Sequence, residues 1–116
     1  MLIRWIVCSL VILLYNQSNL STFNTTNVNN MNHMFYGCSS LQSINLSSFN
    51  TTNVKDMSWM FCGCSSLQSI NLSSFNTTNV KNMRNMFIGC SSLKKENVKI
   101  SNYGKKILDE YCWNYY

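Results

Sequence analysis

The chain has 116 residues, of which 46% are hydrophobic and 11% are charged, and it carries a net charge of +5. This length allows one domain with one core, and Asn, Ser and Thr supply most of its polarity. With no Pro and four Gly, the sequence excludes a Pro/Gly-rich linker and a collagen-like chain.

Residues 1–18 have the layout of a secretory signal. Arg4 precedes an apolar run from Trp5 to Tyr15, and polar residues follow at positions 16–19. The run is too short to cross about 30 Å of hydrocarbon as a comfortable helix. We therefore expect a signal peptide. Because no small-x-small cleavage motif follows, an uncleaved hydrophobic anchor and an apolar cap on the first coil are the alternatives.

Three units of 26 residues follow without a gap, at positions 20–45, 46–71 and 72–97. Each unit combines an LS(S/T)FNTTNV segment with a later MxxMFxGCSS segment. Self-similarity at a fixed period of this size indicates a solenoid, in which each coil contacts only its neighbours and cannot bury its apolar face alone. Residues 20–97 are therefore expected to form one three-coil solenoid.

The apolar positions within one unit fall into two regimes. Spacings of three and four, which predict one face of a helix, join Val54, Met57, Met60, Phe61 and Cys64. A period-two alternation, which predicts a strand, ends the run Leu67, Ile70 and Leu72. Thr52 or Asn53 would cap the helix, and Gly63 would end it. The predicted fold is thus an α/β solenoid, leucine-rich-repeat-like, of three strand-turn-helix coils.

The segment LxxIxLSSFNTTNVxxMxxMFxGCSS resembles the repeat of the BspA-like leucine-rich-repeat surface proteins, and the resemblance covers residues 20–97. It implies a secreted or surface-attached protein with a role in adhesion. Such proteins often carry many repeats and a long anchor region. This chain has three repeats and no evident wall-sorting signal. We therefore expect it to be a fragment of a longer repeat protein or a short paralogue.

The third unit differs where Ile44 and Ile70 stand in the first two, because it has Glu96 there. A carboxylate at an inward site is costly, so stacking is expected to stop. Residues 98–116 are then a C-terminal cap with a short helix at 105–111, or alternatively a binding tail.

Six cysteines occur, and Cys38, Cys64 and Cys90 share one repeat phase. We expect a ladder of stacked apolar side chains there, with disulfides between coils as the rival. The spacing of Cys62 and Cys64 is that of some metal sites. No second cysteine pair exists and the single histidine is His33, so no metal site is expected.

The carboxylates are Asp56, Glu96, Asp109 and Glu110. None is repeated in phase or paired with histidine in the sequence, and no catalytic triad, phosphate loop or zinc-helix motif appears. We therefore expect no enzymatic activity and no cofactor.

The predicted strands would present one polar face, which is the candidate binding site for a protein or host-surface ligand. Its outward residues are Ser43, Asn45, Ser47, Ser69, Asn71 and Ser73. Three rungs span only about 15 Å, so useful adhesion would need multivalency or self-association. The alternative is that this strand face is a solvent-exposed surface that binds no ligand.

Cations gather in the last third of the chain: Lys81, Arg84, Lys94, Lys95, Lys99, Lys105 and Lys106. They could meet an anionic surface such as lipid headgroups or polysaccharide, although a solvated edge explains many such clusters. No nucleic-acid-binding motif is present.

Seven Asn-x-Ser/Thr sequons occur, and Asn24, Asn50 and Asn76 are the best acceptor candidates if the source is eukaryotic. Otherwise they follow from the abundance of Asn, Ser and Thr. Two further functions are a structural, self-associating surface unit and, through the repeated Thr pairs, binding to an ice or crystal lattice.

Overall fold

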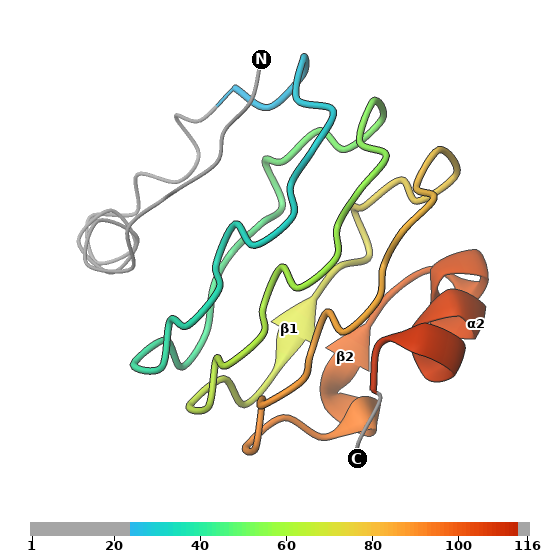
Figure 1. Cartoon of the computed structure of the whole chain (residues 1–116). Coiled ribbons are helices and arrows are strands. Elements are labelled where there is room, and N and C mark those ends of the chain that lie inside the picture. The colour runs from blue at the N-terminus through green and yellow to red at the C-terminus, as the bar shows by residue number, and fades with distance from the viewer. Residues whose placement is uncertain (1–23, 114–116) are drawn as a thin grey trace.

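The computed structural model describes residues 24–113. The three repeats run as successive coils that lie side by side, and the C-terminal helix lies against the last of them (Figure 1). Within residues 24–113, no helix is both long enough and apolar enough to cross a membrane. The expected signal peptide or anchor at 1–18 lies outside the described residues.

The coils are joined by a parallel backbone ladder in the middle of each repeat. The Met31 N–H donates to the Asp56 carbonyl at 2.9 Å, and the Phe35 N–H donates to the Met60 carbonyl at 2.8 Å. Single parallel bridges pair Asn30 with Asp56 and Asp56 with Asn82. Residues 26 positions apart are therefore neighbours in space.

This ladder occupies the segment where the spacing of three and four predicts a helix, and no described coil contains an α-helix there. Alternate amides donate to the next coil, so they are not available for helical bonds within the segment. The backbone is left-handed at His33, Trp59 and Asn85, with φ of 59°, 60° and 57°. Consecutive tight turns produce the spacing instead, as in the 3.3 Å bond from the Met34 N–H to the Met31 carbonyl.

The segment expected to be a strand pairs only briefly. Strand β1 (Ile70–Asn71) lies parallel to β2 (Val98–Lys99), with Ile70 opposite Val98. Two further bonds there run from the Gln68 N–H to the Gln42 carbonyl at 3.2 Å and from the Leu72 N–H to the Lys99 carbonyl at 2.6 Å. The longer backbone ladder of the fold thus lies in the segment predicted to be a helix, and the segment predicted to be a strand carries the shorter one. We call the surface over the longer ladder the ladder face.

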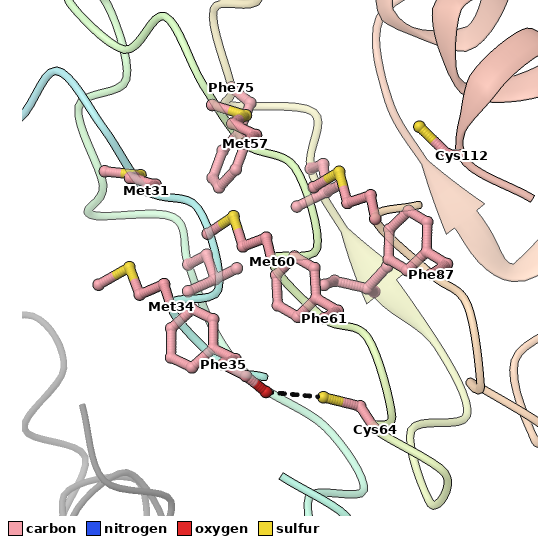
Figure 2. Close-up of a cluster of buried hydrophobic side chains, with 14 of the residues drawn as sticks. Met31, Met34, Phe35, Met57, Met60, Phe61, Cys64, Phe75, Phe87 and Cys112 are labelled. Carbon is pink, nitrogen blue, oxygen red and sulfur yellow. Dashed lines mark hydrogen bonds between the residues drawn. The ribbon is translucent and has the colours of Figure 1, made fainter. Parts of the chain in front are cut away.

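The core is built from columns of identical side chains, one from each coil. Phe35, Phe61 and Phe87 are buried and stack with ring centroids 5.3 and 5.5 Å apart. Methionines of the same phases pack beside them (Figure 2). Because each ring is covered by the ring of the next coil, the apolar face of one coil is buried by its neighbour.

Asparagine side chains shape the turns. Asn24, Asn50 and Asn76 each accept a hydrogen bond at 3.0 Å from the backbone N–H two residues later. The same Asx turn recurs in the first half of the ladder, where Asp56 accepts from the Ser58 N–H at 2.8 Å. The high Asn content therefore has a conformational role, since Asx turns replace backbone turns.

Stacking continues past the third repeat, which corrects the expectation drawn from Glu96. The 3-10 helix η2 (Lys95–Asn97) leaves Glu96 exposed, and Val98 takes the buried place beside Ile70. The chain therefore avoids burying a carboxylate by shifting the pairing register by two residues relative to the 26-residue repeat.

Helix α2 (Asn102–Tyr111) covers the end of the stack and begins three residues before the expected helix. The Ser101 side chain caps it by accepting from the Gly104 N–H at 3.2 Å. Beyond the helix, the Phe87 N–H donates to the Cys112 carbonyl at 3.3 Å, and Trp113 stacks on Phe87 at 5.2 Å. Cys112 and Trp113 thus stand 26 residues after Met86 and Phe87. They add one backbone hydrogen bond to the ladder and one ring to the aromatic stack.

Candidate binding surface

The predicted strand-face residues are all exposed: Ser43, Asn45, Ser47, Ser69, Asn71 and Ser73. Asn45 and Asn71 stand in the same phase, and their side-chain oxygens accept from the Ser47 and Ser73 N–H groups at 3.0 Å. The Ser73 hydroxyl also donates to Asn71 at 2.6 Å. These groups form a small polar patch whose asparagines already serve their own turns.

A second polar surface lies on the ladder face, which the sequence did not single out. A shallow groove there is lined by Asn27, Asn29, Asn53, Lys55, Thr78, Asn79, Val80 and Lys81. The paired backbones fix its position, because the Lys55 N–H donates to the Asn29 carbonyl at 2.9 Å and the Lys81 N–H donates to the Lys55 carbonyl at 2.8 Å. The only sequence signal for it was the repetition of Asn and Lys in one phase.

Threonine and asparagine side chains tie neighbouring coils together at the edge of this groove. The buried Thr51 hydroxyl donates to the Asn76 carbonyl at 3.1 Å and accepts from the Asn76 N–H at 2.8 Å. Thr25 does the same with Asn50. One Thr of each pair is thus used inside the protein, which leaves the exposed Thr26, Thr52 and Thr78 for any lattice array.

An aromatic pair also lies on the ladder face. The rings of His33 and Trp59 stack at 6.0 Å with an interplanar angle of 12°, and Tyr36 contacts His33 at 5.3 Å. Tyr36 is half exposed. The third coil has Asn85 in the phase of Trp59, so the pair does not continue along the stack.

Most of the described cysteines are buried free thiols. Cys62, Cys64, Cys90 and Cys112 are free and buried, and Cys38 is disulfide-bonded. The Cys64 thiol donates to the Phe35 carbonyl at 3.2 Å (Figure 2). The Cys90 thiol likewise donates to the Phe61 carbonyl at 3.0 Å. Burial raises the pKa of each of these two thiols to about 12. Over residues 24–113, no three His, Cys, Asp or Glu side chains gather as a metal-binding group.

Two of the four carboxylates, Asp56 and Asp109, bond to side chains near them in the sequence. Asp56 accepts from the Ser58 hydroxyl at 2.7 Å, and Asp109 forms an ion pair with Lys105 at 3.8 Å. Glu96 and Glu110 are exposed. The His33 ring nitrogen Nδ1 lies within hydrogen-bonding distance, 3.4 Å, of the Asn32 side-chain oxygen.

The cations of the last third and the three best acceptor asparagines are exposed as well. Lys81 and Arg84 line a hollow beside the backbone ladder. Lys94 precedes η2, Lys95 is in η2 and Lys99 is in β2. The Lys95 ammonium lies 5.8 Å from the centre of the Trp113 ring. Asn24, Asn50 and Asn76 are exposed, with their side-chain oxygens held in the Asx turns.

Comparison with known proteins gives a family but no described function. No curated protein and no solved structure matches the chain significantly. A family model described as "Mycoplasma protein of unknown function, DUF285" matches residues 11–109, which include all three repeats and most of α2. The match agrees coarsely with the resemblance to surface repeat proteins, and the chain belongs to the DUF285 family.

Proposed function

We propose that the chain is a short, non-catalytic solenoid of the leucine-rich-repeat-like kind, secreted or displayed at the cell surface, which binds a protein or another host-surface ligand. The observation that carries this proposal is the register of its exposed polar side chains. Residues 26 positions apart become neighbours through the backbone ladder, as the exposed Asn29, Lys55 and Lys81 do. Such a surface repeats one weak contact several times, which favours multivalent binding.

The carboxylates and thiols support a binding role over a catalytic one. The Asp56 carboxylate orders its own turn, and the ladder thiols are buried donors with raised pKa. A nucleophile or general base needs an accessible group with a matched pKa and a partner that activates it.

Saturable binding of the purified full chain to immobilised host matrix and to cultured cells tests the proposal. The variant Ser47→Glu with Ser69→Glu places two charges on the strand face. Its matched control, Ser39→Glu with Ser92→Glu, places the same charges on exposed serines after the ladder turns. We expect the strand-face variant to lose binding and the control to keep it.

Absence of saturable binding to every surface would overturn the proposal. Equal binding by both variants would support a binding protein but would exclude the strand face as its site.

The alternative function, a self-associating surface unit, predicts concentration-dependent oligomers without any foreign ligand. Helix α2 and Trp113 cover the C-terminal end of the stack, which works against end-to-end association there. Light scattering over a concentration series separates the two readings. Growth into larger species in the absence of ligand would replace the adhesive proposal by the structural one.

A further inference from the structure

The groove on the ladder face continues toward the C-terminal helix. A neighbouring hollow is lined by Val80, Lys81, Asn82, Met83, Arg84 and Ile107. It shares Val80 and Lys81 with the groove described above, so the two hollows adjoin. We call the combined depression the ladder groove. It crosses the three coils and ends at α2, and both hollows are open to solvent, so it suits an extended molecule.

The charges of the ladder groove have one sign. Lys55, Lys81 and Arg84 are exposed in its lining, and neither hollow is lined by a carboxylate. Lys55 and Lys81 stand on adjacent coils whose backbones are paired, so their Cα atoms are about 4.8 Å apart. A concave surface with cations and no acidic group favours an anionic ligand.

The amide side chains of the groove are held in place before any ligand arrives. The Asn53 side-chain amide donates to the Thr26 carbonyl at 2.8 Å, and the Asn79 amide donates to the Thr52 carbonyl at 2.8 Å. These bonds to the preceding coil orient the two amides alike and leave their oxygens as acceptors. Groups ordered in advance lose less conformational entropy on binding.

We propose that the ladder groove binds a linear acidic polysaccharide, whose anionic groups pair with Lys55, Lys81 and Arg84 and whose hydroxyls bond the asparagine amides. The proposal goes beyond the proposed function, because it assigns a second binding surface, separate from the strand face, and names its ligand class. A saccharide chain carries both anions and hydroxyl donors at short regular intervals, which the alternating Lys and Asn columns match.

A protein partner fits this groove less well. Binding hot spots between proteins are usually aromatic or arginine anchors in pockets that exclude water. The apolar lining here consists of Val80, Met83 and Ile107, of which the first two are buried and the third is half-buried. An anionic membrane, the other source of negative charge, presents a flat surface without the hydroxyl ladder that would occupy the amides.

Fluorescence-detected binding of the full chain to dextran sulfate, with uncharged dextran as the matched probe, tests the proposal. The variant Lys55→Gln with Lys81→Gln removes two charges from the groove. The control, Lys94→Gln with Lys99→Gln, removes two charges from exposed lysines that line neither hollow. We expect binding of dextran sulfate only, weakened about fivefold or more in the groove variant and much less in the control. Added salt should weaken it further.

Equal weakening of dextran sulfate binding in the two variants would show attraction by net charge alone and would overturn the proposal that the groove is the binding site. Binding to vesicles of phosphatidylglycerol and phosphatidylcholine, with none to dextran sulfate, would also overturn it. Saturable binding to cells that persists in the groove variant, together with no binding to dextran sulfate, would reject this proposal and keep the proposed function.

Discussion

Gly37, Gly63 and Gly89 stand in one repeat phase and all have left-handed backbone, with φ of 74°, 79° and 78°. Their surroundings differ. A Cβ at Gly37 would meet no atom within 4 Å, whereas a Cβ at Gly89 would lie 3.2 Å from the Gly63 Cα. The backbones of adjacent coils thus approach closely at this column, and only the first glycine has open space beside it.

Gly89→Ala should therefore destabilise the protein more than Gly37→Ala. The left-handed conformation costs about 1 kcal/mol in either variant, and the tight backbone contact adds about 1–2 kcal/mol at Gly89. Urea unfolding of both variants measures the difference in the free energy of unfolding. Equal losses would show that the backbone conformation alone requires glycine here.

The buried thiols predict a dependence of stability on pH. Burial raises the pKa of Cys64, Cys90 and Cys112 from 9.0 to about 12. Unfolding releases protons between these values, so the stability is fully present below pH 9.0 and falls as pH rises toward about 12. Each thiol should contribute a slope of about 1.4 kcal/mol per pH unit within that window.

Unfolding free energies at several pH values between about 9.5 and 10.5 check this prediction, with Cys64→Ala as the comparison. The variant should show a shallower decline, by about one thiol's share. Parallel curves for the two proteins would contradict the prediction.

The sequence predicted most of the buried residues but not the conformation that buries them. Val54, Met57, Met60, Phe61 and Cys64 are all buried, as their spacing indicated. A spacing of three and four arises equally from a helix and from successive tight turns. The abundance of Asn, which favours Asx turns over helix interiors, was the sequence signal for turns.

At the scale of elements, the C-terminal segment acts as a fourth, shortened coil. Ring stacking runs from Phe35 through Phe61 and Phe87 to Trp113. The Cys112 thiol donates to the Met83 carbonyl at 3.0 Å, as the other ladder thiols donate to the coils before them. Helix α2 replaces most of the coil, so the last repeat is covered without presenting a new ladder.

Trp113→Ala should uncover Phe87 and lower the free energy of unfolding by about 3 kcal/mol, because a large buried ring is removed. Tyr103→Ala is the matched control, since Tyr103 is on α2 and is 59% exposed. Chemical unfolding measures the loss, and light scattering should show association of the Trp113 variant through its uncovered end. Wild-type stability in that variant would mean that Trp113 does not serve as a cap.

The candidate site was less predictable than the core. The strand face, including Asn45 and Asn71, is exposed as expected, but its binding role stays a prediction. The groove with Lys55 and Lys81 was not foreseen, because a helix there would have separated these side chains from their neighbours in the next coil. Pairing between coils is a long-range property that local periodicity does not encode.

At the scale of the whole molecule, the second coil is the most enclosed. The Met57 and Phe61 N–H groups donate to the third coil, and the Asp56 and Met60 carbonyls accept from the first. In a stack whose units contact only their neighbours, stability is lowest at the ends.

Hydrogen exchange should therefore be slowest at the amides of Met57, Trp59 and Phe61. The Gln68 amide, in the sparsely bonded half of its coil, should exchange faster. Exchange monitored by NMR gives the order directly. Uniform protection of all coils would show a single cooperative unit in place of a graded stack.

The ladder also sets how this surface can change between related chains. Each coil bonds to the next through the same donors and acceptors, so one whole repeat could be gained or lost by recombination between nearly identical coding segments without breaking any pairing rule. Every such event would lengthen or shorten the ladder groove by one rung of about 4.8 Å, adding or removing one residue of the Asn column and one of the Lys column. The number of repeats would then act as a ruler for the length of polymer that the protein holds.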